Sequence, residues 1–249
     1  MILKKKITFL VFLVLIVLSR VCLISGQESN IFLVKLKNID QVENFATDKN
    51  LEIIRVIEKI DTLVVRDNGI HSDAILKNIA TDERVVFVEH DNMVSIPRDE
   101  IYFKINKGDL VTIETDDLFW ATDPNTKIGQ WNMRVLDFEN AWSAETGEDN
   151  VIVAVVDSGI AYDHPEIESR YIQGGYDWIN EDDDPYDDNG HGSWVAGVIA
   201  AEKNNDIGIA GIAEVSIMAE KVLNSNGGGT ISNLILGMIH AADFGADII

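Results

Sequence analysis

Two residues whose side chains can move a proton stand next to predicted buried elements of this sequence. Asp157 directly follows VIVAVV at 151–156, a continuous apolar run typical of a strand buried on both faces of a parallel sheet. Residues just past the carboxyl ends of such strands line the crevice where ligands bind. The carboxylate therefore serves the chemistry of that crevice, or it caps the next turn, with Gly159 supplying the bend.

His191 stands between an acidic loop and SWVAGVIAA at 193–201, a small apolar run that predicts a tightly packed helix. If Asp157 accepts the Nδ1 proton of His191, Nε2 is free to take a proton from a nucleophile. Gly190 and Gly192 leave room for a substrate or a neighbouring backbone, which a histidine that merely begins a buried helix does not require. We therefore predict a catalytic Asp–His pair. The acidic loop contains Asp182, Asp183, Asp184, Asp187 and Asp188.

An α/β domain over residues 130–249 is predicted to position this pair. SIMAEKVL at 216–223 predicts a second strand, and TISNLILGMIHAADFGA at 230–246 predicts an amphipathic helix that Gly245 ends. The final ADII predicts the start of another strand, so the fold class is α/β with a parallel sheet. The apolar stripe of the helix consists of Ile231, Leu234, Ile235, Met238, Ile239 and Ala242.

Residues 27–97 form a separate predicted module. Between residues 31 and 96, NIFLVKLK, LEIIRVI, TLVVR and RVVFVEHD predict strands in the order β-α-β-β-α-β. This is the order of a small α+β ferredoxin-like domain, and the module shows no chemistry of its own. Residues 98–129 predict a linker or activation segment. The two helices are expected to bury Val42, Phe45 and Ala46, and Ile75, Leu76 and Ile79, with Ser72 capping the second.

The first 26 residues predict a secretory signal peptide. Three lysines precede an apolar run at 7–18, and the small residues Ser25 and Gly26 follow. The run is short for a membrane anchor and Arg20 interrupts its continuation. Cys22, the only cysteine, is a weak candidate for lipid attachment because small residues do not precede it. We expect a secreted protein, extracellular or periplasmic, with no stable membrane anchor and no disulfide.

Acidic residues outnumber basic ones by 42 to 20, which gives a formal net charge of −22 at pH 7. This balance argues against nucleic acid as a partner, because phosphate backbones require clusters of Lys and Arg. It indicates a solvated acidic surface or an affinity for hard cations. Zinc has little support, since the five histidines are scattered, no HExxH motif occurs and the cysteine lies in the predicted signal peptide.

Two segments carry a resemblance to a known family. VAVVDSGIAYDH at 153–164 and HGSWVAGVIAA at 191–201 resemble the aspartate and histidine segments of subtilisin-like serine proteases, the subtilase family or peptidase S8. Asp157 before His191 is the family's chain order, in which the serine comes last. The resemblance extends over residues 130–249, and residues 31–96 are similar to the family's inhibitory propeptide. It implies polypeptide substrates and the chain's own propeptide as an intramolecular inhibitor.

The resemblance also implies a substrate-binding edge. The edge comprises Gly227, Gly228 and Gly229, which pair with an extended substrate backbone, and Ile231 lies near a hydrophobic subsite. Without the family, NSNGGGT at 224–230 predicts a flexible loop before a helix.

Calcium is the cofactor that the resemblance implies. Glu166, which stands where Asp is common, matches a structural calcium site together with Asn205 and the backbone carbonyls of Ile207 and Ile209. The acidic loop at 182–188 is a candidate for a second ion or a merely solvated loop, and it lacks the EF-hand spacing.

The sequence departs from the family pattern in two respects. Ser193 and Trp194 stand where the family has Thr and often His; Ser keeps the hydroxyl, whereas Trp194 is bulkier beside the base. No serine after His191 lies in the Gly-Thr-Ser-Met-Ala context of the family nucleophile, and the oxyanion-hole Asn is also missing. As written, these residues are expected to be an inactive N-terminal part of a secreted zymogen. The alternative is a secreted non-catalytic protein, either a propeptide-like protease inhibitor or a pseudoenzyme.

Overall fold

The computed structural model describes residues 30–69, 72–96 and 129–249. Contacts divide the chain into two compact units, Met1–Val94 with Gly229–Leu236 and Ser95–Gly228 with Gly237–Ile249. The predicted signal peptide and residues 98–128 of the predicted linker lie outside the described residues. Within the described ranges, no helix has the length and hydropathy that a membrane span requires.

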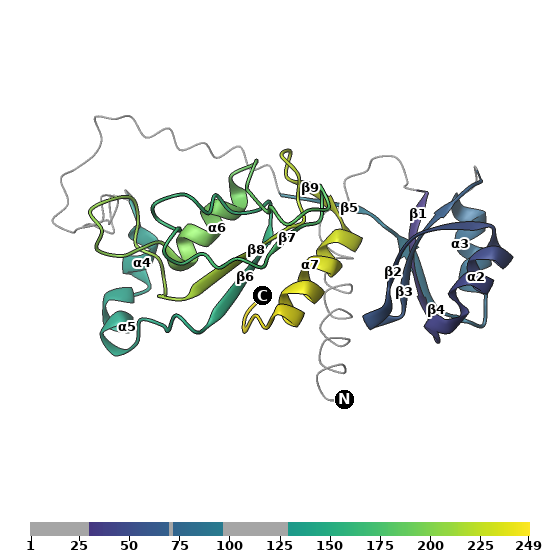
Figure 1. Cartoon of the computed structure of the whole chain (residues 1–249), viewed down its shortest axis with the longest axis horizontal. Coiled ribbons are helices and arrows are strands. Elements are labelled where there is room, and N and C mark those ends of the chain that lie inside the picture. Colours follow the sequence, from purple (N-terminus) through teal and green to yellow (C-terminus); the bar gives the residue numbers. More distant parts are fainter. Residues whose placement is uncertain (1–29, 70–71, 97–128) are drawn as a thin grey trace. The chain divides into compact units, whose positions relative to one another are not determined.

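The first unit contains an antiparallel sheet with the strand order β2-β3-β1-β4 (Figure 1). Its helices and strands follow one another in the predicted order β-α-β-β-α-β. The elements are β1 (Ile31–Leu36), α2 (Val42–Lys49), β2 (Leu51–Ile57), β3 (Thr62–Asp67), α3 (Ser72–Ala80) and β4 (Val85–His90), with 3-10 turns at Ile39–Gln41 and Glu58–Ile60.

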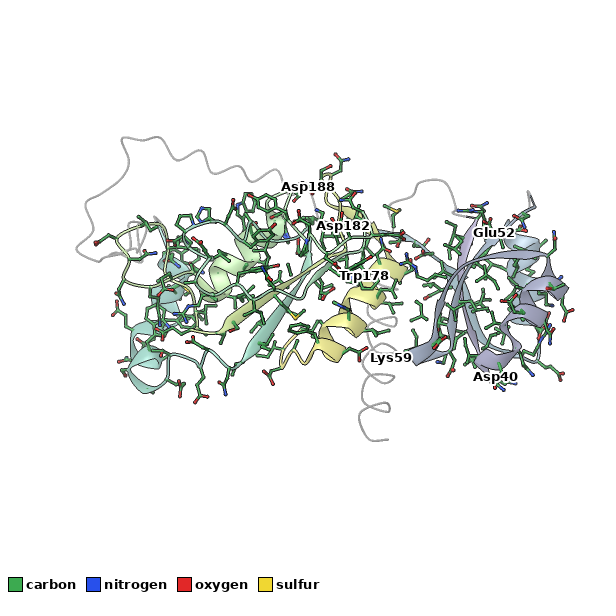
Figure 2. All side chains as sticks on the ribbon, in the orientation of Figure 1. Asp40, Glu52, Lys59, Trp178, Asp182 and Asp188 are labelled. Carbon is green, nitrogen blue, oxygen red and sulfur yellow. The ribbon has the colours of Figure 1, made fainter. Side chains whose placement is uncertain are left out.

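The core of the first unit lies between this sheet and its two helices. Phe32 of β1, Phe45 of α2 and Ile79 of α3 belong to one cluster and are fully buried, as the predicted apolar positions require. On the exposed side of β2, Glu52 pairs with Arg66 of β3 at 2.8 Å (Figure 2). Side chains alternate between buried and exposed along β2, whereas the central strands β1 and β3 are buried on both faces, since Leu33 and Val64 are 1% and 4% exposed.

The second unit contains a parallel sheet with the order β6-β8-β7. Its strands are β6 (Ile152–Asp157), β7 (Tyr176–Asp177) and β8 (Ser216–Lys221). The helices α6 (His191–Ala200) and α7 (Ile231–Phe244) lie on opposite faces of this sheet (Figure 1). Near the C-terminus, Ile248 forms a parallel bridge with Val153, at the place where ADII predicts a further strand.

Alternation along the strands of the parallel sheet decides which helix each side chain meets. Val153 and Val155 of β6 pack in the cluster that contains Ala196 of α6, whereas Ala154 packs with Ala241 of α7. Asp157 continues the Val153–Val155 series, so its side chain is directed to the α6 face. The apolar run of β6 therefore both buries the strand and aims the carboxylate.

One predicted strand end and one predicted buried position differ from the structure. The second strand ends at Lys221 and not at Leu223, because the N–H groups of Val222 and Leu223 donate to the carbonyl oxygen of Asp157, at 2.8 and 3.1 Å. In α7 the fully buried position is Ala241, whereas the predicted Ala242 is only half-buried.

Two short helices are missing from the sequence-based prediction, α4 (Trp131–Val135) and α5 (Phe138–Ala144). Asp137 separates them in a left-handed conformation, with a φ of 60°. Trp142 anchors α5 by donating from Nε1 to the carbonyl oxygen of Ile212 at 2.7 Å. Helices of this length offer too few turns for a periodic pattern, and this contact is distant in sequence.

Candidate active site

The Asp157 carboxylate and the His191 imidazole meet in the second unit. Nδ1 of His191 lies 2.9 Å from Oδ1 and 2.8 Å from Oδ2 of Asp157. The side chain of Asp157 is 14% exposed and that of His191 is 36% exposed, so the carboxylate is held inside while the imidazole reaches solvent. With Asp157 as the acceptor for Nδ1–H, Nε2 remains available to another group.

Two glycines let the end of β6 and the start of α6 approach each other. At Gly192 a Cβ would lie 2.1 Å from the carbonyl oxygen of Gly159. At Gly159, where φ is 103°, a Cβ would lie 2.5 Å from the carbonyl oxygen of Pro185. A side chain at Gly192 would push the start of α6 away from the turn after β6, and one at Gly159 would push that turn away from the loop at Pro185. The predicted close approach of backbone beside His191 is therefore confirmed at Gly192.

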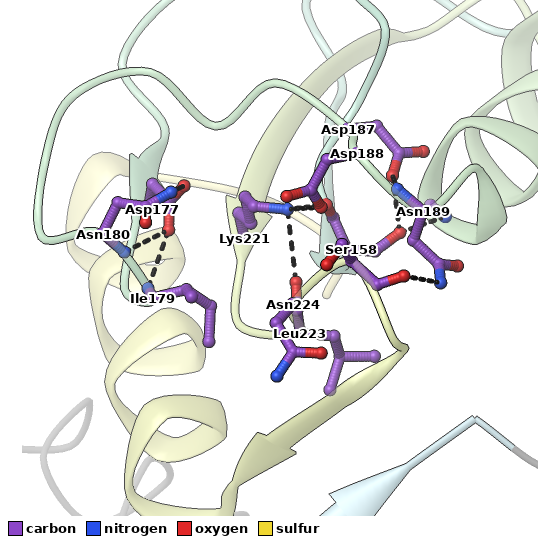
Figure 3. Close-up of polar contacts among 12 residues, drawn as sticks. Ser158, Asp177, Ile179, Asn180, Asp187, Asp188, Asn189, Lys221, Leu223 and Asn224 are labelled. Atoms are coloured by element: carbon purple, nitrogen blue, oxygen red, sulfur yellow. Dashed lines mark hydrogen bonds and ion pairs between the residues drawn. The ribbon is translucent and has the colours of Figure 1, made fainter.

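Asp187 is a buried carboxylate that connects these two elements (Figure 3). Its Oδ1 accepts hydrogen bonds from Ser158 Oγ at 2.8 Å, Gly190 N at 2.8 Å and Asn189 N at 3.0 Å. Its Oδ2 accepts from Ser193 N at 2.9 Å and Ser193 Oγ at 2.6 Å. Ser158 directly follows Asp157, and the other donors flank His191, so one carboxylate fixes the separation of the candidate catalytic pair.

The hydrogen bonds to Asp187 also keep it ionised. Burial raises the pKa of its carboxyl group, but donors from Gly190, Ser193 and Asn189 outweigh that effect and hold the pKa below its ordinary value. A charged carboxylate at the first turn of α6 is further favoured by the helix dipole.

Lys221, the last residue of β8, is a fully buried cation beside the same turn (Figure 3). Its Nζ donates to the carbonyl oxygens of Ser158 at 2.6 Å and Leu223 at 3.3 Å, and to Asp188 Oδ1 at 2.5 Å. A buried ammonium requires such partners. The acidic loop is thus partly structural, because Asp188 is tied through Lys221 to the turn after Asp157.

Asp177, at the end of β7, is buried for a local reason (Figure 3). Its Oδ1 accepts from the N–H groups of Ile179 and Asn180 at 2.7 and 2.9 Å, and its Oδ2 accepts from Asn180 Nδ2 at 2.9 Å. The carboxylate therefore closes a turn, as expected for an Asx turn.

The Gly-rich run forms a strand and not a flexible loop. Strand β9 (Gly228–Thr230) pairs with β5 (Met93–Ser95), and Ile96 N donates to the carbonyl oxygen of Gly227 at 2.9 Å. Ile231 begins α7 with its side chain 7% exposed. The run accepts an extended neighbour, whereas the substrate roles of Gly227, Gly228, Gly229 and Ile231 stay predictions.

Glu166 lies against the loop at 205–209, whereas the calcium role of these residues stays a prediction. The carboxylate is 6% exposed, and it accepts from Asn205 Nδ2 at 3.0 Å and Ile209 N at 2.9 Å. Ile207 N donates to Asn205 Oδ1 at 3.1 Å. Both partners of Glu166 are neutral N–H donors, so the buried carboxylate keeps its charge and spare lone pairs, which are the donor chemistry that a hard cation prefers. Among the described residues, no group of three or more His, Cys, Asp or Glu is placed to hold a metal ion.

Sequence reasoning missed the supporting roles of Ser158, Asp187 and Lys221. A signal for Asp187 was present, because an Asp placed three residues before Gly190 can accept the N–H groups of its own turn. No local signal identifies Lys221, whose partners lie on three different segments.

A parallel sheet with helices on both faces and an Asp–His pair at the carboxyl ends of its strands is the arrangement that the resemblance to subtilisin-like proteases implies. Residues 148–249 match the model of the subtilase family, Peptidase_S8.

The curated relatives include proteins named as serine proteases. The thermophilic serine proteinase of Bacillus sp. (strain AK1) is 44% identical over 110 residues, covering 44% of this chain and 27% of the relative. Thermitase of Thermoactinomyces vulgaris is 37% identical over 132 residues, covering 53% and 47%. The minor extracellular protease Epr of Bacillus subtilis is 35% identical over 164 residues, covering 66% and 23%. The chain thus spans less than half the length of these relatives.

A solved structure shows the same fold. Fervidolysin from Fervidobacterium pennivorans, a keratinolytic enzyme related to subtilisin, aligns with a TM-score of 0.65 and 23% identity, covering 89% of this chain and 35% of that one. The subtilisin-like fold class predicted from the sequence is therefore confirmed.

Proposed function

We propose that the chain is part of a secreted serine endopeptidase in which Asp157 orients His191 as the general base. This proposal rests on the distances from His191 Nδ1 to the two carboxylate oxygens of Asp157, 2.9 and 2.8 Å, and on the partial exposure of the imidazole. Asp157 holds the Nδ1 proton, and Nε2 takes the proton of a serine hydroxyl as its oxygen attacks the peptide carbonyl. The same nitrogen then returns the proton to the leaving amine. Hydrolysis by the full-length protein should require both side chains.

The nucleophile is proposed to lie outside these residues, because none of the serines after His191 has the family's sequence context. The alternative function, a non-catalytic protease inhibitor, needs no contact between Asp157 and His191. The distances between these two side chains therefore favour the enzyme.

The first unit, with its ferredoxin-like strand order, is proposed to be the inhibitory propeptide. Strand β5 follows the four-stranded sheet along the chain and pairs with β9, the Gly-rich strand that is proposed to bind substrate. A strand that adds to a sheet edge supplies backbone hydrogen bonds and blocks the same edge for another peptide. This self-pairing supports an inhibitory role.

Secretion rests on the N-terminal pattern and on a relative named as an extracellular protease. We propose that residues 1–26 are removed on export. N-terminal sequencing of the exported protein tests this proposal, and recovery of the protein only within cells would contradict it.

Calcium is proposed to bind between Glu166 and the loop at 205–209, where it would neutralise the buried carboxylate and hold the loop in place. With the ion at about 100 times its dissociation constant, binding adds about 2.7 kcal/mol to the free energy of unfolding. Chelation of the full-length protein should therefore lower Tm by several degrees.

The matched variant is Glu166→Gln, which keeps the shape of the side chain and removes its charge. Chelation should leave the Tm of this variant nearly unchanged. An equal drop in Tm in both proteins would show that calcium binds elsewhere, and no drop in the unsubstituted protein would contradict the site.

A further inference from the structure

The second unit contains a cavity of about 420 Å³ that is separate from the Asp157–His191 contact. This volume falls in the range of about 300–1,000 Å³ that small-molecule sites occupy. Aromatic, acidic and glycine residues dominate the wall. The lining residues are Tyr162, Tyr171, Gln173, Gly174, Gly175, Tyr176, Asp183, Asp184, Pro185 and His240.

Stacked tyrosine rings form one side of the cavity. The rings of Tyr162 and Tyr171 lie 4.9 Å apart, with 26° between their planes. A hydrogen bond of 2.7 Å from the hydroxyl of Tyr162 to Asp184 Oδ1 fixes this ring beside the carboxylate. The rings are therefore held in place, and aromatic faces of this kind attract cations.

The charge of the lining is negative. Asp183 and Asp184 are both exposed, and among the described residues no Lys or Arg contributes to the wall. Burial, followed by the charges of Asp184 and Glu220, raises the pKa of Tyr171 to about 12. The smaller, electrostatic part of this shift comes from the negative charges of Asp184 and Glu220.

A buried acid, Glu220, holds the lining residue His240 in place. Glu220, which is fully buried in β8, accepts hydrogen bonds from His240 Nδ1 at 2.7 Å and Trp178 Nε1 at 2.8 Å. The His240 ring in turn lies 6.1 Å from the ring of Tyr176. Glu220 therefore fixes the aromatic wall and balances the charge that His240 gains when it is protonated. Trp178, which donates the second of these bonds, is labelled in Figure 2.

These features select among ligand classes. No Lys or Arg among the described residues of the wall is available to bind an anion. An apolar ligand would exclude water from the carboxylates of Asp183 and Asp184 without replacing their hydrogen bonds. A hard metal ion needs about six to eight oxygen ligands, whereas much of this lining consists of aromatic and glycine residues. A planar organic cation uses both parts of the wall, because it stacks on the tyrosines and hydrogen-bonds to the carboxylates.

We infer that this cavity binds a guanidinium group, carried either by a free small molecule or by an arginine side chain of a polypeptide. The cavity is connected to the turn that follows Asp157. Ile160, three residues after Asp157, donates its N–H to the carbonyl oxygen of Pro185 in the cavity wall at 3.0 Å. The binding does not depend on catalysis, so it is measurable whether or not the proposed protease activity holds.

The test is calorimetric titration of the full-length protein with arginine amide and with citrulline amide, its uncharged isostere. Arginine amide should bind with a dissociation constant of about 1 mM, typical of a single small group, and citrulline amide at least about tenfold more weakly. An arginine-containing peptide that binds more tightly than arginine amide would identify a polypeptide as the source. Equal affinity for arginine amide and the peptide would identify a free small molecule.

Two variants locate the binding. Asp183→Asn, at an exposed position, removes one charge, and Tyr176→Leu removes one ring; each should weaken arginine amide binding by about fivefold or more. Glu139→Gln, an exposed acid of α5 outside the wall, should bind as the unsubstituted protein does. Equal binding of citrulline amide, unchanged binding in both wall variants, or displacement of arginine amide by millimolar calcium alone would overturn the inference.

Discussion

Replacing His191 by alanine should lower kcat for peptide hydrolysis by the full-length protein by about 10⁴-fold or more, the size of loss that serine proteases in general show, subtilisin included. Asp157 holds Nδ1 of this imidazole, with distances of 2.9 and 2.8 Å to the two carboxylate oxygens. Without the imidazole, no positioned base takes the proton from the nucleophile. KM should change much less than kcat, because His191 acts on the transition state.

The measurement is single-turnover and steady-state hydrolysis of a peptide amide by the secreted protein. Asp157→Asn should also lower kcat by about 10⁴-fold, since an amide at this position stabilises the wrong tautomer of the imidazole. His90→Gln, which replaces a histidine at the end of β4 in the first unit, serves as the matched control and should retain full activity. Activity of His191→Ala within tenfold of the unsubstituted protein would remove His191 from the mechanism.

The contact between Asp157 and His191 was predictable because each residue marks the end of an element with a strong pattern. VIVAVV fixes both the strand and the alternation that turns Asp157 toward α6. The glycines beside His191 indicate that two backbones approach there, and the structure shows this approach at Gly192. In the first unit the same two periodicities predict the order of strands and helices.

Groups that depend on distant partners were not predictable. Lys221 reads as part of an apolar strand, yet its ammonium group is satisfied by Ser158, Asp188 and Leu223. Glu220 likewise has its partners on α7 and in the turn after β7, at His240 and Trp178. A one-dimensional pattern records that such residues are polar, but the register of the parallel sheet decides which partners they meet.

The sequence places Asp187 in an acidic loop, which we interpret from the sequence as a candidate site for a second ion or as a merely solvated loop. The structure buries Asp187 and leaves Asp188 half-exposed. Since Asp187 receives donors from both sides of the Asp157–His191 contact, we expect it to be a positioning residue for that pair.

Asp187→Asn should destabilise the full-length protein by about 2–3 kcal/mol at pH 7 and lower kcat by about 10- to 100-fold. The amide keeps one acceptor oxygen, but its NH₂ group replaces Oδ2, which accepts hydrogen bonds from Ser193 N and Ser193 Oγ. The NH₂ group cannot accept these bonds, so two donors lose their partner. A shift of His191 by a fraction of an ångström relative to Asp157 accounts for the loss in kcat. Asp182→Asn is the comparator: this acid of the same loop is exposed and its amide oxygen can still accept from Asp184 N, so the losses should be several-fold smaller.

The pH dependence separates the charge of Asp187 from its shape. The pKa of Asp187 is depressed in the folded protein, so its charge stabilises the fold above the unfolded pKa of about 3.9, and this contribution is lost as the pH falls through the folded pKa. The amide introduced by Asp187→Asn does not titrate. The difference in unfolding free energy between the two proteins, measured by urea denaturation, should therefore be largest at about pH 6–7 and shrink as the pH falls below about 4. A constant difference in unfolding free energy down to about pH 3 would mean that Asp187 acts through shape alone. If Asp187→Asn leaves the dependence of the hydrolysis rate on pH unchanged, Asp187 does not position the base.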